Sequence, residues 1–207
     1  MRLAAYGLLL FLSLAVAGYA IGVYGFLPVG ALVSPEMRTT YESERAGIYA
    51  HVFGASVAMA LGPFQFSRRL RTRRPTLHRW MGRLYLGVGV LFGGLAGLYM
   101  AFYAWGGPVA KAGFAMLAIL WLYTGWQAYA AARARDFMTH RRWMVRNFAL
   151  TFAAVTLRIW LPSSMAAGID MAVAYPVIAW LCWVPNLVLA EVWFNRPALA
   201  GSPPSRG

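Results

Sequence analysis

The sequence predicts an all-α protein, a polytopic membrane helix bundle of about six transmembrane helices with both termini in the cytoplasm. Apolar residues make up 60% of the 207 residues, and the mean hydropathy is +0.56. These residues gather in blocks of about twenty, the length of helix that crosses a bilayer. The ionisable residues fall between the blocks, because bilayer hydrocarbon cannot solvate charge.

The basic residues are distributed unequally between the two predicted sides of the membrane. Fifteen of the 19 lysines and arginines fall on one side: Arg2 precedes the first apolar block, twelve lie in two basic loops, and two lie in the C-terminal tail. Arg38, Arg45 and Lys111 fall on the other side, and Arg158 lies inside an apolar block. Because arginines in short loops hold those loops in the cytoplasm, this asymmetry predicts that both termini are inside.

The first helix is expected at residues 3–27. Its beginning resembles a signal peptide, with AVAGYA near residue 20 as a candidate cleavage site. The apolar run continues to Leu27, which is long enough to span, so we expect an uncleaved helix. The segment from Pro28 to Arg45 carries mixed charges and is expected outside the membrane.

The second and third helices are expected at residues 46–66 and 83–103. The second carries His51 near its outer end. The third carries a GxxxGxxxG row that allows another helix backbone to approach closely. The row consists of Gly89, Gly93 and Gly97. It is also a candidate contact for a homo-oligomer.

The remaining helices are expected at residues 112–132, 143–162 and 171–194. In the fifth helix, polar residues recur at three- and four-residue steps and predict a polar stripe along one face. The stripe includes His140, Asn147, Thr151 and Arg158. We therefore expect one transmembrane bundle over residues 1–195 and a disordered cytoplasmic tail over residues 196–207.

One motif occurs twice, each time just before a predicted helix. The segment Arg68–Tyr85, RRLRTRRPTLHRWMGRLY, contains seven of the eighteen arginines. Its core, HRWMGR from His78, recurs with one residue inserted as HRRWMVR from His140. Orientation in the membrane requires arginines here but does not require this order twice. We therefore expect the function to lie on the cytoplasmic side, near these two segments.

Two kinds of chemistry fit the repeated motif. Histidines at similar depth on facing helices can ligate a b-type haem, which makes His78 and His140 candidate ligands. Arginines nearby would pair with the haem propionates or with lipid phosphates. These arginines are Arg79, Arg83, Arg142 and Arg146. In a third interpretation, the histidine, arginine and tryptophan residues only anchor the helices at the membrane surface.

His51 and Arg158 are expected at a comparable depth on the outer side. His51 is a candidate single haem ligand, a proton carrier or a packing residue. A charge inside the membrane calls for a partner, and Asp170, Glu42, Glu44 and helix-end carbonyls are candidates. A cavity with both residues would suit an anionic or quinone-like ligand, and a structural salt bridge is the alternative.

Several functions lack support in the sequence. It contains no P-loop, no HExxH motif, no nucleophile elbow and no paired intramembrane carboxylates, so catalytic residues are unknown. Its single cysteine, Cys182, excludes a cysteine metal cluster, and no metal other than haem iron is expected. The net charge of +13 is explained by membrane orientation and anionic headgroups, so we expect no nucleic-acid partner.

Three segments resemble an uncharacterised family of bacterial predicted multi-helix membrane proteins, known as a domain of unknown function. They are LGPFQF at Leu61–Phe66, LHRWMGRLY at Leu77–Tyr85 and HRRWMVRNFALTFAAVTLR at His140–Arg158. The resemblance extends from about Ala46 to the last helix and implies the same multi-helix fold, with His51, His78, His140 and Arg158 as motif positions. A looser fold-level similarity links the chain to b-type cytochromes of the ferric-reductase and cytochrome b561 kind.

These observations leave three hypotheses for a protein of the bacterial inner membrane. The first is a haem- or quinone-associated redox protein with haem b as a candidate cofactor. The second is a non-enzymatic protein that binds or transports an anionic lipid or small molecule through the cytoplasmic His/Arg/Trp motifs. The third is a membrane scaffold. Whether the protein is an enzyme stays open at this stage.

Overall fold

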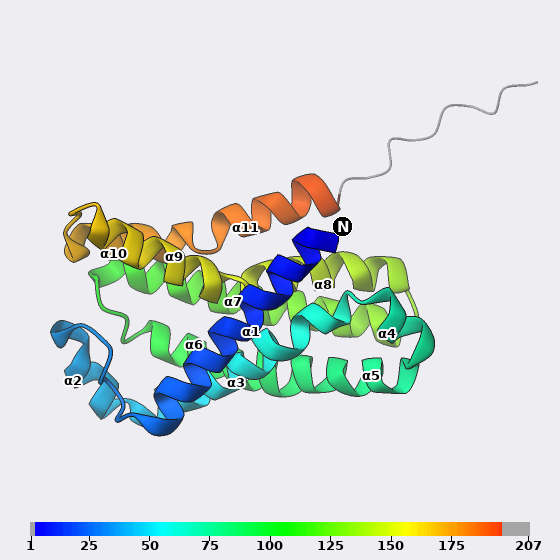
Figure 1. The fold of residues 1–207 in the computed structure, drawn as a ribbon, viewed down its shortest axis with the longest axis horizontal. Coiled ribbons are helices and arrows are strands. Elements are labelled where there is room, and N and C mark those ends of the chain that lie inside the picture. The colour runs from blue at the N-terminus through cyan, green and yellow to red at the C-terminus, as the bar shows by residue number, and fades with distance from the viewer. Residues whose placement is uncertain (1–2, 196–207) are drawn as a thin grey trace, which may run out of the picture.

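The computed structural model describes residues 3–195, and within them the chain forms helices joined by short connections, with no strand (Figure 1). Six helical segments in this part of the chain are long and apolar enough to cross a bilayer. The all-α membrane fold expected from the sequence is thereby confirmed. The tail over residues 196–207, predicted to be disordered, lies outside the described residues.

The spans are built from one helix each or from consecutive helical segments. The first two are α1 (Leu3–Phe26) and α3 (Arg45–Gln65). The third consists of α5 (Pro75–Leu84), the π-helical η1 (Tyr85–Phe92) and α6 (Gly93–Ala101), and the fourth is α7 (Gly107–Arg133). The fifth joins α8 (Phe137–Thr151) to α9 (Ala153–Ala166), and the sixth joins α10 (Met171–Leu181), α11 (Val184–Leu189) and η2 (Ala190–Phe194). Short helices α2 (Pro35–Ser43) and α4 (Arg68–Arg73) connect the first three spans.

The third and fifth spans begin earlier than residues 83 and 143, where hydropathy places their starts. Helix α5 starts at Pro75, whose fixed φ and missing N–H suit the first helical position. Helix α8 is capped by Asp136, whose side chain accepts a hydrogen bond from the Thr139 backbone N–H at 3.0 Å. Both copies of the repeated motif therefore lie inside helices.

The two basic segments lie at one end of the bundle, which we call the arginine-rich end. It contains α4 and the first turns of α5 and α8, on the right in Figure 1. The other end, which we call the opposite end, contains α2 and the starts of α3 and α7 (Figure 1). Both basic segments of the chain thus lie at the same end of the bundle.

The glycine row of the third span packs against α3 of the same chain. A Cβ at Gly89 would lie 2.6 Å from the Cβ of Ala58, and a Cβ at Gly93 would lie 2.9 Å from the backbone nitrogen of Ala55. Both distances are too short for a real Cβ, so this contact requires glycine. Self-association stays a prediction, and any such contact has to use other faces of the third span.

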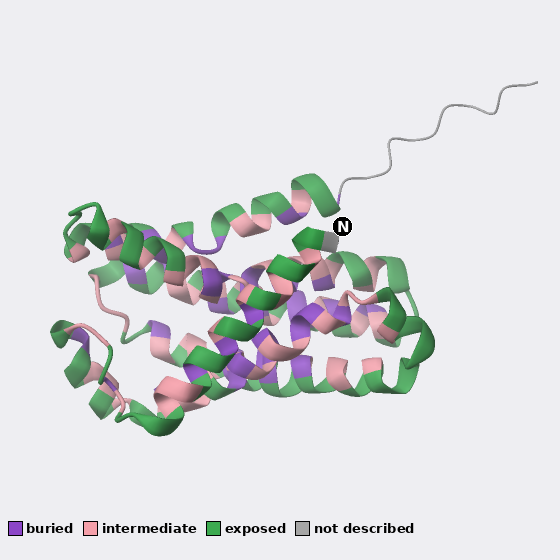
Figure 2. Ribbon diagram, in the orientation of Figure 1, coloured by how far each residue is buried: buried purple, intermediate pink, exposed green. Residues whose placement is uncertain are grey.

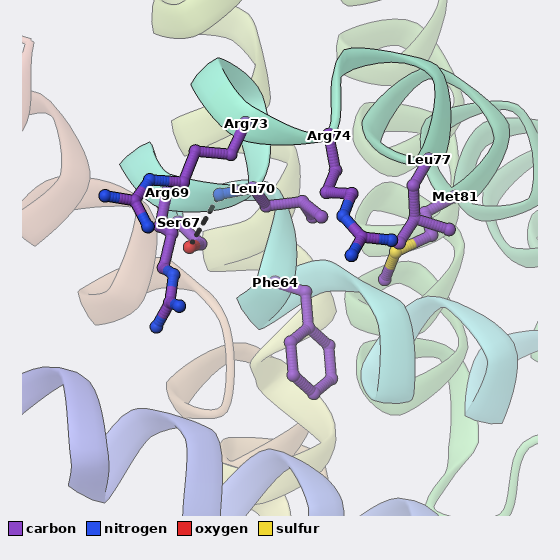
Figure 3. Close-up of a pocket in the computed structure, with 8 residues that line it drawn as sticks. All are labelled: Phe64, Ser67, Arg69, Leu70, Arg73, Arg74, Leu77 and Met81. Atoms are coloured by element: carbon purple, nitrogen blue, oxygen red, sulfur yellow. Dashed lines mark hydrogen bonds between the residues drawn. The ribbon is translucent and has the colours of Figure 1, made fainter.

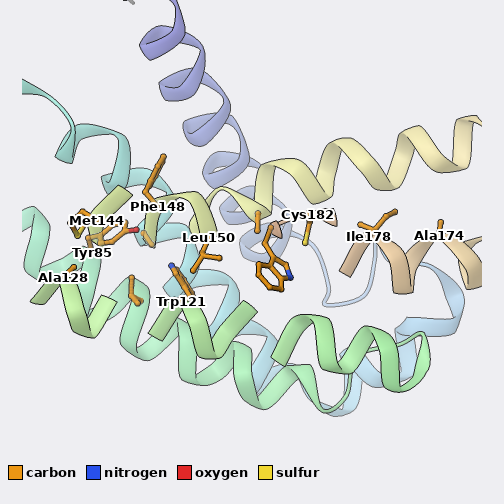
Figure 4. Close-up of a cluster of buried hydrophobic side chains, with 13 residues drawn as sticks. Tyr85, Trp121, Ala128, Met144, Phe148, Leu150, Ala174, Ile178 and Cys182 are labelled. Atoms are coloured by element: carbon orange, nitrogen blue, oxygen red, sulfur yellow. The ribbon is translucent and has the colours of Figure 1, made fainter. Parts of the chain in front are cut away.

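A cluster of buried side chains extends from the place where η1, α7 and α8 meet to α10 (Figure 4). The largest of them include Tyr85, Trp121, Met144 and Phe148. Figure 2 shows this buried region along the middle of the bundle, whereas α1 and α11 are largely exposed. The exposed apolar faces of these helices are those expected to meet lipid.

The sixth span is interrupted at Trp183, between α10 and α11. Pro185 follows this break and cannot donate a helical hydrogen bond. The carbonyl oxygen of Cys182 accepts hydrogen bonds from the side chains of Thr156 and Asn186. Side chains therefore form hydrogen bonds with a backbone carbonyl group that the break leaves without a helical partner within the membrane.

Candidate functional site

Both copies of the repeated motif form the same contact between tryptophan and arginine. In α5, the guanidinium carbon of Arg83 lies 4.8 Å from the ring centroid of Trp80. In α8, that of Arg146 lies 4.3 Å from the ring centroid of Trp143. A spacing of three residues places each pair on one helix face. A cation–π contact therefore explains the repeated Trp-Met-X-Arg order.

His78 and His140 both lie at the arginine-rich end, close enough to influence each other electrostatically. His140 donates from Nδ1 to the carbonyl oxygen of Ala128 on α7, at 2.8 Å, because a carbonyl can only accept. Its Nε2 stays available for a second partner. The Nδ1 atom of His78 is buried and has no hydrogen-bond partner within residues 3–195.

The four arginines expected around these histidines differ in their surroundings. Arg146 donates from Nε and Nη2 to the carboxylate of Glu191, at 2.5 and 2.9 Å. Its charge is already compensated by the protein. Arg79, Arg83 and Arg142 are exposed. They are accessible to an anionic group from outside the protein.

A cleft lies between the end of α3, helix α4 and the start of α5 (Figure 3). We call it the arginine cleft, and its volume is about 640 Å³. Its lining residues are Phe64, Ser67, Arg69, Leu70, Arg73, Arg74, Leu77 and Met81. The second cleft, of about 540 Å³, adjoins it on α4 and shares Arg69 and Arg73. Both clefts are lined by residues of the first basic segment.

The lining of the arginine cleft combines cationic and apolar groups. Arg69, Arg73 and Arg74 contribute guanidinium groups, and no acidic side chain lines the cleft. The Arg74 side chain extends beside Leu77 and Met81 (Figure 3). The cleft therefore offers phosphate-binding groups next to a surface that an acyl chain can cover.

A buried polar network lies deeper in the bundle, between η1, α7 and α8. The Asn147 side chain accepts from the Tyr85 hydroxyl at 2.7 Å and donates to the Trp121 carbonyl at 2.7 Å and to Thr124 Oγ1 at 2.9 Å. Thr151 Oγ1 accepts from the Trp121 indole N–H at 2.8 Å. Because these buried groups are hydrogen-bonded to one another, the network is a structural element that fixes three helices.

His51 and Arg158 lie far from the arginine cleft, toward the opposite end. The Nδ1 atom of His51 donates to the carbonyl oxygen of Gly93 at 2.9 Å. A Cβ at residue 97 would lie 2.7 Å from that same nitrogen, so Gly97 leaves room for the imidazole. His51 and Arg158 are close enough for electrostatic interaction.

The acids considered as partners for Arg158 have other roles or lie elsewhere. Glu44 accepts a hydrogen bond from the Tyr99 hydroxyl at 2.6 Å. Asp170 caps α10 by accepting from the Ala172 N–H at 2.7 Å. In the described part of the chain, no carboxylate lies within 4.0 Å of Arg158. The guanidinium instead donates from Nη1 to a carbonyl of its own helix, that of Ala154, at 2.9 Å.

Sequence reasoning missed the aromatic surroundings of Arg158 and the apolar wall of the arginine cleft. Tyr19 on α1 lies under the guanidinium, with its ring centroid at 5.4 Å. Phe64 and Met81 belong to different helices and line the same cleft only because α3 packs against α5. Neither arrangement has a local sequence signal, because both depend on how separate helices pack.

Together, the fold and these sites define a polytopic α-helical membrane protein with an arginine-lined cleft at one end. The chain belongs to the family described as Predicted membrane protein (DUF2306), whose model matches residues 48–194. The matched region contains both motif copies, the arginine cleft, His51 and Arg158. No curated protein matches the sequence, and no solved structure matches the chain.

Proposed function

We propose that this protein binds an anionic amphiphile in the arginine cleft, at the cytoplasmic face of the bacterial inner membrane. The observation that carries the proposal is the composition of the cleft, because three arginines and no acid line it together with apolar side chains. Arginine suits phosphate because its planar guanidinium can donate two parallel hydrogen bonds to it. A phospholipid or lysophospholipid combines that phosphate with an acyl chain.

The cytoplasmic orientation is supported by the distribution of basic residues. Arginines concentrate in α4 and at the starts of α5 and α8, all at the arginine-rich end. The positive-inside rule assigns such an end to the cytoplasm, where anionic lipids also attract it. Each Lys or Arg near an anionic membrane surface contributes about 1 kcal/mol of attraction. The cleft would then select a lipid from those that the surface charge concentrates.

Lipid analysis of the purified protein tests this proposal. The variant R69A/R73A/R74A removes the three guanidinium groups of the cleft. The matched control R133A/R135A/R141A removes three exposed arginines between the end of α7 and the start of α8, none of which lines the cleft. We expect anionic phospholipid to co-purify with wild type and the control and to be depleted in the cleft variant. Equal lipid content in all three proteins would refute the proposal.

A second candidate function is electron transfer by a haem b between His78 and His140, and the orientation of His140 favours it. Histidine ligands of metals usually donate the other ring N–H to a carbonyl or carboxylate. His140 follows this pattern through Ala128, and the unpartnered Nδ1 of His78 is a polar atom that a bound group would satisfy. Iron held between these rings would supply one-electron chemistry.

An absorption spectrum decides this second candidate. Protein purified from haem-replete cells should show a Soret band that shifts on reduction with dithionite. The variant H78Q/H140Q should lose the band, and His51→Gln, at the opposite end, should keep it. A colourless wild-type protein excludes haem ligation. A quinone-associated or purely scaffolding protein would also be colourless, and lipid analysis then separates a scaffold from the amphiphile-binding protein.

A further inference from the structure

The guanidinium of Arg158 lies against a tyrosine ring of α1, away from the arginine cleft, and other side chains of α1, α2 and α3 lie within electrostatic range of it. Arg158 belongs to α9, and its guanidinium carbon lies 5.4 Å from the ring centroid of Tyr19 on α1. Tyr24 on α1 and Tyr41 on α2 lie within electrostatic range of it, with their hydroxyl groups close to each other. His51 on α3 also lies within that range. We call these five residues the Arg158 site.

The positive charge of this site has no compensating negative charge within residues 3–195. No carboxylate lies within 4.0 Å of the guanidinium, and its one described hydrogen bond goes from Nη1 to the carbonyl oxygen of Ala154. Arg158 precedes the end of its span at Ala166 by eight residues, or about 12 Å along the helix. A charge at such a depth is costly unless a partner compensates it.

The groups around the guanidinium can donate hydrogen bonds to oxygen. Burial raises the pKa of Tyr41 to about 12, so its phenol is protonated at neutral pH and can donate. His51 uses Nδ1 for the Gly93 carbonyl, which leaves Nε2 for another partner. Arg158, Tyr24, Tyr41 and His51 all keep part of their surface exposed in the structure.

We infer that the Arg158 site binds an oxyanion, a carboxylate or a phosphate, at the opposite end of the membrane bundle. An anion supplies the missing negative charge and can accept hydrogen bonds from the guanidinium and the two phenols. A neutral carbonyl ligand could accept the same hydrogen bonds, but it would leave the positive charge of Arg158 uncompensated. The site shares no residue with the arginine cleft. It therefore does not depend on the function proposed for that cleft.

Binding measurements on the full chain in detergent test this inference. All proteins carry R69A/R73A/R74A, so that the arginine cleft does not contribute to binding. The probes are oleate, lysophosphatidate, inorganic phosphate and, as an uncharged amphiphile, monoolein. Arg158→Gln removes the charge of the site, and Arg45→Gln removes an exposed charge from the same end of the bundle as a matched control.

We expect at least one of the three anions to bind and monoolein not to bind. Arg158→Gln should weaken anion binding by about 30-fold or more, and Arg45→Gln should leave it unchanged. Binding of inorganic phosphate would identify a soluble oxyanion as the ligand, whereas binding of oleate or lysophosphatidate alone would identify the headgroup of an amphiphile.

A second variant keeps the inference testable if Arg158→Gln does not fold. Y24F/Y41F keeps both rings and removes the two phenolic donors, and it should weaken anion binding by about fivefold or more. The inference is overturned if none of the three anions binds. It is also overturned if an anion binds Arg158→Gln, or Y24F/Y41F in its place, as tightly as the parent protein.

Discussion

Replacing Asn147 with alanine should destabilise the bundle more than any exposed polar substitution. The Asn147 amide makes three hydrogen bonds to groups on η1 and α7: to the Tyr85 hydroxyl, the Trp121 carbonyl and Thr124 Oγ1. Hydrogen bonds between helices in membrane proteins contribute about 0.6 kcal/mol on average and up to about 1.7 kcal/mol each. We therefore expect Asn147→Ala to lower the free energy of unfolding by about 2 to 5 kcal/mol.

Reversible unfolding in mixed micelles with increasing SDS, followed by circular dichroism, measures this change. Gln127→Ala is the matched control, because the Gln127 amide donates to the Tyr123 hydroxyl at an exposed position on one helix, at 2.9 Å. Gln127→Ala should lower the free energy of unfolding by less than about 0.5 kcal/mol. The loss in free energy of unfolding for Tyr85→Phe combined with Asn147→Ala should differ from the sum of the two single losses by about 1 kcal/mol. Equal losses for Asn147→Ala and Gln127→Ala would refute the assignment of this network as a structural element.

The same unfolding assay tests three further predictions. Gly93→Ala should lower the free energy of unfolding by about 1 to 3 kcal/mol, because the added Cβ would overlap the α3 backbone. An unchanged midpoint of the unfolding transition would contradict this packing. Glu191→Gln should lose about 1 kcal/mol by breaking the partly exposed pair with Arg146, less at high salt, and a salt-independent loss would contradict an electrostatic origin. The Thr139 backbone N–H lowers the pKa of Asp136, so the ionised cap stabilises α8 above about pH 4 and this stabilisation fades as the pH falls through the lowered pKa. Asp136→Asn should keep the cap without this pH dependence, and Asp136→Ala should lose both; identical pH profiles for wild type and Asp136→Asn would argue against the cap.

Hydropathy located the spans but not their starts at the arginine-rich end. The first two turns of α5 and α8 contain histidine and arginine and extend beyond the apolar blocks. The signals that predict these starts are Pro75 and Asp136. They favour the first turn of a helix through backbone geometry and N-capping, and hydropathy does not report them. Local capping rules would therefore have placed His78 and His140 inside helices.

The partners of polar residues were harder to predict than their positions. The polar stripe of the fifth span identified Asn147 and Thr151, but Tyr85 joins them only because of the rotation of η1 against α8. For Arg158 we expected an acid or helix-end carbonyls, and the structure provides the Ala154 carbonyl and the Tyr19 ring. Sequence spacing fixes which residues share a face of one helix, but it does not fix which face another helix presents.

The arginine cleft illustrates the same limit. The sequence gives the charge of the Arg68–Tyr85 segment, which orientation in the membrane explains in large part. It does not show that Phe64 from the preceding helix forms an apolar wall beside Arg69 and Arg74. That wall distinguishes a site for an amphiphile from a surface that is only positively charged.

The most direct test of amphiphile binding in the arginine cleft is native mass spectrometry of the full chain with equal amounts of phosphatidylglycerol and phosphatidylcholine. We predict that wild type and the control R133A/R135A/R141A retain phosphatidylglycerol preferentially. The variant R69A/R73A/R74A should lose that preference, because the guanidinium groups of the cleft are absent. If the variant retains phosphatidylglycerol as wild type does, or wild type shows no preference, the arginine cleft does not bind an anionic amphiphile.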